Sequence, residues 1–303
     1  MEGFDALLSA HASKQKSGPS KGDSRKRVRE HSVPIYTENE YDRKRKRALE
    51  KKIPKEVIGR NLVIVCAGDT SLHESSKFPW HGSKGFDLCI VYYGSDENVK
   101  KRFEGQSKFF FQKRGPKWQL VRHALKNCDW KEYEYIWLPD DDLEMDPELI
   151  VKMFDIAAKY MIRLGQPALF DENIQPKYKH VIKKRDGAVL HFTNFVEIMC
   201  PFLRVDALEA VFHTLDSDEA KSGWGLDMLW PTLLDFRDIA VFDATPVRHT
   251  RPQNAFNVTN SFYKEFKIDP QREYFDLKRK HRFNDFKIRV ISEIPDKKSS
   301  RRS

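Results

Sequence analysis

Three consecutive aspartates, Asp140, Asp141 and Asp142, are the residues whose type and spacing most clearly favour chemistry. They follow the apolar run 135–139, which predicts a buried strand, so they lie at its carboxyl end, where open α/β sheets bind their ligands. Because side chains alternate along extended backbone, Asp140 and Asp142 should point the same way and Asp141 the other way. Such a pair of carboxylates suits Mg²⁺ or Mn²⁺ carrying a diphosphate.

An acidic helix start follows these aspartates and has a structural explanation. Asp146, Pro147 and Glu148 have the pattern of an N-cap, a proline at the first helical position and a first-turn acid, ahead of a helix over 149–160. We assign Asp146 and Glu148 to that helix. The explanation does not cover the three upstream aspartates, whose mutual repulsion costs free energy unless a cation or solvent screens it.

Two earlier strands also end in a small residue and an acid. The runs 61–67 and 87–93 predict strands, the first ending at Gly68 and Asp69 and the second leading to Asp96. A nucleotide could meet backbone amides there, with an acid for its base or ribose. Each could equally be an ordinary turn. We therefore name Gly68, Asp69 and Asp96 as candidates for donor binding and keep the turn as the alternative.

The second half of the chain adds two acids and a tryptophan. Glu197 stands inside the otherwise apolar run 191–202. A buried carboxylate without a partner is costly, so it should meet a cation, a substrate hydroxyl or a backbone amide. The glycines on either side of Trp224 free the backbone to turn sharply and expose the ring. Asp227 follows and is well placed to cap a helix over 228–234.

The order of the elements predicts the fold class. A helix over 117–125 and strands over 109–111, 165–170 and 241–246 join the elements above. The repeated pattern of strand, crossover and strand favours a single α/β, Rossmann-like domain with a mostly parallel sheet and helices on both faces. His249 lies where the last strand runs into a loop and is a candidate metal ligand, although a lone histidine is weak evidence.

The net charge of +9 is unevenly placed. Residues 1–57 hold 15 Lys and Arg against 9 Asp and Glu, and residues 278–303 hold 10 against 3. The stretch between them is therefore net acidic, and a nucleic-acid groove over the whole fold is not implied. We expect a disordered basic segment over 1–55, a catalytic domain over 56–277 and a mobile basic tail over 278–303.

Targeting signals bear on where the chain acts. It has no apolar stretch of membrane-spanning length, and its start lacks the features of a secretory signal, so we expect a cytoplasmic or nuclear protein. Two basic clusters, 26–29 and 43–47, are spaced like a bipartite nuclear import signal or are simply solvated charge. The four cysteines show no metal spacing and are expected to be buried free thiols.

Five sequence blocks taken together resemble the uncharacterised family numbered 707 among domains of unknown function, and their order also resembles a glycosyltransferase of the A-type fold. The resemblance covers residues 60 to 255 and rests on the joint presence of the blocks Pro139–Asp142, Gly165–Leu169, Phe195–Met199, Gly223–Asp227 and Val247–His249.

The resemblance implies roles for the candidate residues. Asp142 would ligate a divalent metal held against the donor's diphosphate, Asp140 would approach the ribose or the metal, and His249 would complete the metal shell. The block around Trp224 resembles that of inverting transferases, in which the following acid contacts the acceptor hydroxyl. Asp227 thereby becomes the candidate catalytic base.

We therefore expect a metal-dependent, inverting glycosyltransferase that moves a sugar from a nucleotide-sugar donor to an acceptor hydroxyl. The cofactor would be Mn²⁺ or Mg²⁺ and the donor a UDP-sugar, with Glu197 on a sugar hydroxyl. The acceptor stays open among a glycan, a protein, a small molecule and a nucleic acid. Two alternatives are a nuclear glycosyltransferase acting on a hydroxylated nucleic-acid base and a catalytically inactive module that binds nucleotide sugars.

Overall fold

The computed structural model describes residues 59–74, 79–170, 177–215, 220–250 and 261–296. The basic segment 1–55 and its clusters 26–29 and 43–47 lie outside the described residues. Among the residues that are described, no helix is long and apolar enough to cross a membrane.

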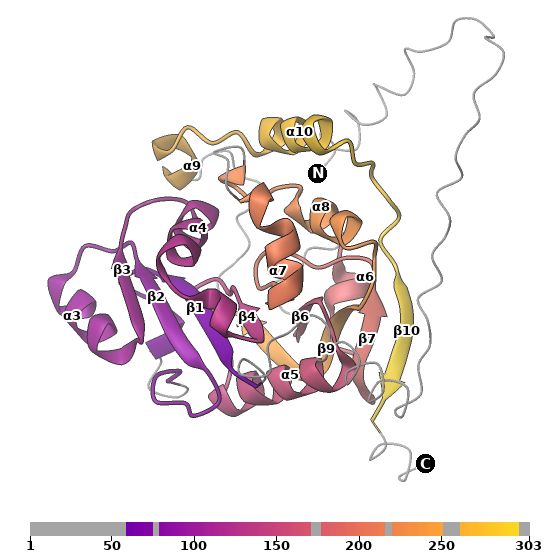
Figure 1. Ribbon diagram of the computed structural model, residues 1–303, viewed down its shortest axis with the longest axis horizontal. Helices are drawn as coiled ribbons and strands as arrows, with labels where there is room; N and C mark the ends of the chain where they lie inside the picture. The colour runs from indigo at the N-terminus through magenta and orange to yellow at the C-terminus, as the bar shows by residue number, and fades with distance from the viewer. Residues whose placement is uncertain (1–58, 75–78, 171–176, 216–219, 251–260, 297–303) are drawn as a thin grey trace, which may run out of the picture. The chain divides into compact units, whose positions relative to one another are not determined.

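A large mixed sheet forms the centre of the fold (Figure 1). Its strand order is β10-β7-β9-β6-β8-β4-β1-β2-β3, and β5 pairs with β9 off this path. The strands are β1 (Asn61–Ala67), β2 (Asp87–Tyr92), β3 (Phe109–Gln112), β4 (Tyr135–Trp137), β5 (Leu143–Glu144), β6 (Leu164–Leu169), β7 (Ala188–Thr193), β8 (Phe202–Arg204), β9 (Ile239–His249) and β10 (Val290–Pro295).

The sheet is mostly parallel, as the sequence predicts. β1 pairs in parallel with β2 and β4, β2 with β3, and β6 with β9. β8 is antiparallel to both β4 and β6, and β7 is antiparallel to both β9 and β10, so β7 and β8 run against the common direction. The acids that follow β1, β2 and β4 consequently lie at one edge of the sheet.

Helices cover both faces of the sheet (Figure 1). Alternate residues of β1 supply two separate cores: Val63 and Val65 pack on the face with α3 and α5, and Leu62 and Ile64 on the face with α4, α7 and α8. The helices are α3 (Glu97–Gln106), α4 (Lys117–Asn127), α5 (Pro147–Tyr160), α6 (Lys179–Ile182), α7 (Val205–Val211), α8 (Leu226–Leu233), α9 (Ser261–Glu265) and α10 (Pro270–His281).

The predicted start of α5 is confirmed. Asp146 is the N-cap, its carboxylate accepts a hydrogen bond from the Glu148 backbone N–H at 2.8 Å, and Pro147 is the first helical residue. The helix ends at Met161, which has left-handed backbone with φ 55°. The four cysteines are buried and free, which is also as predicted.

The predicted carboxyl-terminal boundary is wrong. α10 extends to His281, and β10 pairs with β7 inside the stretch 278–303 that we expected to be a mobile tail. β10 is short and only partly buried, and its apolar residues Val290, Ile291 and Ile294 do not alternate regularly, so its hydrophobic pattern is weak. It is held by main-chain pairing and by Asn194, which bonds the Lys287 carbonyl and the Arg289 amide, both at 2.9 Å.

Candidate active site

Asp141 joins the ends of three strands and has a structural role. Its Oδ2 accepts hydrogen bonds from the Gly68 backbone N–H at 2.9 Å and from the Tyr93 hydroxyl at 2.8 Å. Gly68 must be small, because a Cβ there would lie 2.9 Å from the Tyr93 ring. The side chain of Asp141 is therefore turned back into the fold, as the alternation along the strand predicts.

Asp142 lies beside His249 because of the β5–β9 pairing. The register sets Leu143 opposite His249, and the backbone and side chain of Thr250 both donate to the Asp142 carbonyl, at 3.1 and 2.9 Å. This brings the Asp142 Oδ2 to 3.2 Å from the His249 Nε2. Burial lowers the pKa of His249, but the hydrogen bond and charge of Asp142 outweigh it and raise the pKa above its usual value.

Asp140 forms an ion pair with Lys117, the first residue of α4. Their Oδ1 and Nζ atoms are 2.6 Å apart, and the Asp140 side chain is 36% exposed. Burial raises the pKa of Asp140, Lys117 lowers it and Asp142 raises it, with a net upward shift. Asp140 and Asp142 also both add to the negative charge felt by His249, so the two carboxylates share one region.

Glu197 lies in the connection between β7 and β8 and faces the same region. Its backbone N–H donates to the Gln166 Oε1 at 2.6 Å, and its carboxylate accepts from the Met199 N–H at 2.9 Å. A backbone amide was one of its three expected partners. Burial first, and then the charge of Asp140, raises the pKa of Glu197 to about 7, so this carboxyl group exchanges a proton near neutral pH.

Asp227 is in the first turn of α8, but it is not the N-cap that we predicted. Gly225, with φ 95°, occupies the cap position, since a left-handed backbone there suits glycine. Burial raises the pKa of Asp227 to about 6, against the hydrogen bond from the Met228 amide. Burial, and then the charges of Asp227 and Glu197, raise the pKa of Tyr178, so these three groups are neighbours.

The turn that carries Trp224 is sharp, as predicted, and the ring is half-buried rather than exposed. Gly223 has φ 79°, and a Cβ there would lie 1.9 Å from the Trp118 ring nitrogen, so no larger residue fits. The turn is anchored to α10 by Glu273, whose Oε2 accepts from the Ser222 backbone N–H at 2.7 Å and from its hydroxyl at 2.6 Å.

Asp69 and Asp96 serve the local turns. Asp69 accepts hydrogen bonds from the Tyr92 hydroxyl and from the Ser95 amide, the latter at 3.2 Å. The bond from Tyr92 lowers the pKa of Asp69 and outweighs the opposing effect of burial. Asp96 is the N-cap of α3 and accepts from the Asn98 amide at 2.8 Å. Both lie at the predicted edge, and a role in nucleotide binding stays a prediction for them and for Gly68.

The metal ligands can be tested against the geometry. Within the described ranges no group of three or more His, Cys, Asp or Glu side chains forms a ready metal site. Among the described residues, Asp142 and His249 are a candidate pair of ligands, because their facing atoms are 3.2 Å apart and could both turn to one divalent ion. Neighbouring ligands of a six-coordinate Mg²⁺ at 2.0–2.1 Å are about 2.9 Å apart. Such ions usually take few protein ligands and complete their shell with phosphate and water.

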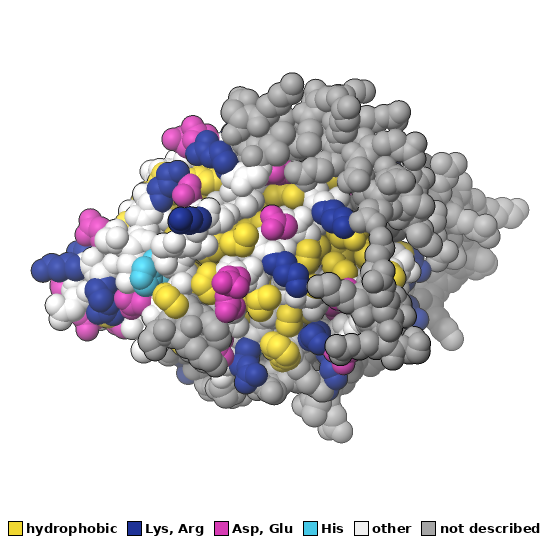
Figure 2. All heavy atoms as spheres, turned by 90° about the horizontal axis from the view of Figure 1, so that it is seen from below, with side chains coloured by type: hydrophobic (Ala, Val, Ile, Leu, Met, Phe, Trp, Pro, Cys, Tyr) yellow, Lys and Arg dark blue, Asp and Glu magenta, His cyan; other side chains and the backbone are white. Residues whose placement is uncertain are grey.

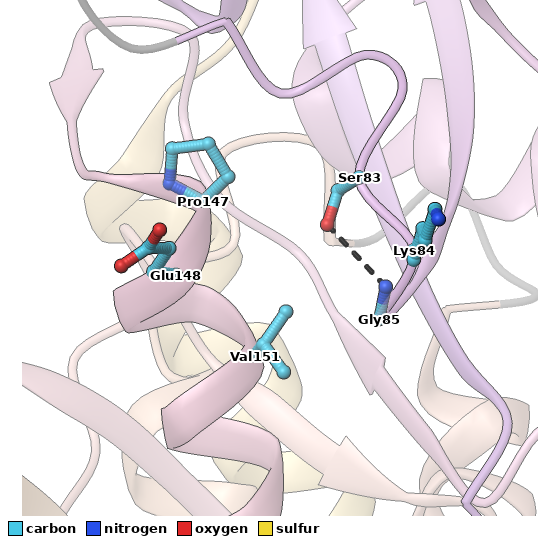
Figure 3. Close-up of a pocket in the computed structure, with 6 residues that line it drawn as sticks. All are labelled: Ser83, Lys84, Gly85, Pro147, Glu148 and Val151. Carbon is cyan, nitrogen blue, oxygen red and sulfur yellow. Dashed lines mark hydrogen bonds between the residues drawn. The ribbon is translucent and has the colours of Figure 1, made fainter.

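An open groove elsewhere on the molecule is distinct from this site (Figure 3). It lies between the loop before β2 and the start of α5, and it is lined by Ser83, Lys84, Gly85, Pro147, Glu148 and Val151. The Gly85 carbonyl accepts from the side chain of Asn61, the first residue of β1. The groove therefore lies near the amino ends of the strands, away from the acid cluster.

A family model describes this chain over most of its length. The model described as "Protein of unknown function (DUF707)" matches residues 76–294. The chain belongs to this family. The match reaches into β10, which agrees with the corrected carboxyl-terminal boundary.

Solved structures show weaker likeness to this DUF707 protein. The crystal structure of S. aureus TarS 1-349 matches with 13% identity and a TM-score of 0.46, covering 72% of this chain and 71% of that one. The crystal structure of S. aureus TarS matches with 13% identity and a TM-score of 0.47, covering 72% of this chain and 43% of that one. A search of curated proteins found no match.

Lys117 is a residue of the site that sequence reasoning missed. Its partners Asp140, Ile198 and Met199 lie far along the chain, so no local pattern reveals them. One signal was available: a lysine in the first turn of a helix opposes the helix dipole and therefore calls for a local reason.

Proposed function

We propose that this DUF707 protein is a metal-dependent glycosyltransferase that uses a nucleotide-sugar donor. The observation that carries the proposal is the convergence of Asp142, His249, Asp140, Glu197 and Asp227 at the carboxyl edge of a mostly parallel sheet. Five ionisable groups in one region, several with displaced pKa values, are the environment expected of a catalytic site.

The residues divide into two halves around the reacting bond. Asp142 and His249 would hold the divalent ion, which when bound supplies positive charge for the departing diphosphate. Asp227 would accept the proton of the acceptor hydroxyl while that oxygen bonds to the anomeric carbon and the bond to the diphosphate breaks. Glu197 would hold a hydroxyl of the transferred sugar. This division corresponds to an inverting reaction with one displacement.

Surface charge is the feature of the described residues that bears on a nucleic-acid acceptor. On the face seen in Figure 2, acidic and basic side chains are interspersed rather than gathered by sign. The basic clusters 26–29 and 43–47 lie outside the described residues. In the basic stretch at the end of α10, Lys278 pairs with Asp285 and Arg279 with Asp276. We therefore propose a hydroxyl acceptor without a polyanionic backbone, and a UDP-sugar as the donor to test first.

Donor binding and turnover can be measured separately. Thermal shift with a panel of nucleotide sugars, with and without Mn²⁺, should show stabilisation by one donor class that depends on the metal. Slow donor hydrolysis that requires Mn²⁺ should accompany it. Binding without hydrolysis or transfer to any acceptor would instead indicate an inactive sugar-binding module, and no binding at all would contradict the proposal.

The metal assignment has a matched pair of variants. Asp142→Ala should abolish the Mn²⁺-dependent part of donor binding, since it removes one of two fitting ligands. Asp146→Ala should keep donor binding and lose only a helix cap, about 1 kcal/mol of unfolding free energy. Equal, undiminished donor binding by both variants would show that Asp142 does not hold the metal.

A further inference from the structure

Lys117 lies between the two halves of the site. Its Nζ is 2.6 Å from the Asp140 Oδ1, 3.0 Å from the Ile198 carbonyl oxygen and 2.7 Å from the Met199 carbonyl oxygen. These carbonyls directly follow Glu197 in the connection between β7 and β8. One ammonium group thus contacts the acid cluster after β4 and the loop that carries Glu197.

The contacts of Lys117 occupy all three of its N–H donors. An ammonium group has three N–H donors, and three acceptors lie within hydrogen-bonding distance of this one. Its side chain is 18% exposed, so it is largely removed from solvent. It also stands at the start of α4, where the helix dipole disfavours a cation. The carboxylate of Asp140 offsets that cost.

The backbone strengthens the same arrangement. The Asp140 N–H donates to the Met199 carbonyl at 2.9 Å, so this oxygen receives both the backbone of Asp140 and the ammonium of Lys117. Removing the ammonium would leave Asp140 next to Asp142 with no cation in contact. Two neighbouring carboxylates without a cation between them attract a divalent ion.

We propose that Lys117 is a positioning residue that fixes Asp140 against the Glu197 loop and withholds this carboxylate from the divalent ion. The role of Lys117 in catalysis rests on the proposed function. The inference leaves Asp142 and His249 as the protein ligands of the metal. Lys117 therefore acts as a built-in cation for Asp140, which would otherwise be free to become a third protein ligand of the metal.

Metal affinity tests the proposal without any sugar transfer. Mn²⁺ would be titrated into the full-length protein and followed by the electron paramagnetic resonance of free Mn²⁺. Lys117→Met removes the cation and frees Asp140, so Mn²⁺ should bind about tenfold more tightly. Lys117→Gln keeps a donor for the carbonyls and should shift the affinity in the same direction. It also provides the measurement if Lys117→Met does not fold.

A second variant shows whether the effect passes through Asp140. In an Asp140→Asn background, Lys117→Met and Lys117→Gln should change the Mn²⁺ affinity by less than twofold, because the carboxylate that they release is gone. In transfer assays, the single variants should lose at least tenfold in kcat, with a smaller change in the donor KM. Lys117→Arg should recover part of that loss.

Lys108 supplies the matched control. It forms an ion pair with Asp87, the first residue of β2, at the same 2.6 Å separation. Lys108 lies over the ring of Tyr133 as Lys117 lies over that of Trp118, but at the amino ends of the strands, away from the acid cluster. Lys108→Met should leave Mn²⁺ affinity and kcat unchanged. Unchanged or weaker Mn²⁺ binding by both neutral Lys117 variants, or an increase that persists in full with Asp140→Asn, would overturn the proposal. Failure to transfer sugar would leave these binding results intact.

Discussion

At the level of single residues, Asp227 offers the sharpest test of the proposed chemistry. Because Gly225 is the N-cap of α8, Asp227→Asn removes proton acceptance and leaves the cap in place. General-base catalysis contributes about 10² to 10⁴ in rate. We expect D227N to fold, to bind the donor with near-parent affinity and to lose at least about a hundredfold in transfer rate.

The pKa of about 6 for Asp227 fixes the direction of the accompanying pH profile. A base acts only when it is deprotonated, so transfer by the parent should rise with pH through about 6 and then level off. Transfer by D227N within a few fold of the parent would leave Asp227 structural. The search for a base would then move to Glu197, and a retaining mechanism would be reopened.

Glu197 carries a stability cost that depends on pH. Its pKa is raised from 4.5 to about 7, so the folded protein binds this proton more tightly than the unfolded chain does. The associated stability is complete below pH 4.5 and is lost as the pH rises through about 7. Glu197→Gln should therefore be more stable than the parent at pH 8 by about 1 to 3 kcal/mol, and nearly equal at pH 4.

Urea unfolding at the two pH values measures this difference. The amide keeps an oxygen for the Met199 N–H, so packing changes little. A stability difference of the same size at both pH values would show that it does not arise from titration of Glu197.

At the level of elements, α10 supports the turn around Trp224. Glu273 holds both polar groups of Ser222, and a Cβ at Gly225 would lie 3.0 Å from the Tyr274 ring, so helix and turn are in close contact. Glu273→Ala should leave a folded protein whose transfer rate falls about tenfold or more, because a misplaced catalytic group loses rate steeply.

Glu209 provides the comparison for that variant. It pairs with Lys131 at 2.7 Å on a surface where both side chains are more than half exposed, so Glu209→Ala should cost less than about 1 kcal/mol and leave transfer unchanged. Equal transfer by the two variants would mean that α10 does not position the turn.

The elements also show what the sequence could and could not predict. β1 and α5 were placed nearly to the residue, since strong apolar patterns and a proline-bearing cap define them locally. β10 was missed because its strand character depends on pairing with β7, about 100 residues earlier in the chain. Asp227 was misplaced as a cap because Gly225, which lies against Tyr274 of α10, takes that position with a positive φ.

The acid cluster followed the same division. The aspartates and His249 could be proposed as site residues because they follow predicted strands. The β5–β9 register that brings Asp142 to His249 could not be predicted, because it depends on the fold. The contacts of Lys117 could not be predicted, because the two carbonyls that it bonds are 81 and 82 positions away in the chain. Only its unfavourable place in the first turn of a helix marked it. Distant side chains that neutralise a cluster leave little trace in local sequence.

At the level of the whole molecule, the amount of apolar surface that each end of the chain buries decides whether that end contributes to the stability of the domain. The segment 1–55 is too polar to bury much apolar surface, so its deletion should leave the melting temperature nearly unchanged. The other end differs, because residues 283–296 include the buried Phe283 and the strand β10.

Deleting residues 283–303 should therefore destabilise the domain, while deleting only 297–303 should not. The longer deletion removes the β10–β7 pairing and the Asn194 bonds to Lys287 and Arg289, and it exposes β7 as an unpaired edge. In a domain of this size about 1 kcal/mol shifts the melting temperature by 2–4 °C, so we expect a fall of at least about 5 °C with concentration-dependent aggregation. Scanning calorimetry of the three deletions against the full chain measures this. Equal melting temperatures for the two carboxyl-terminal deletions would show that residues 283–296 do not stabilise the domain and belong to the tail, as expected from the sequence.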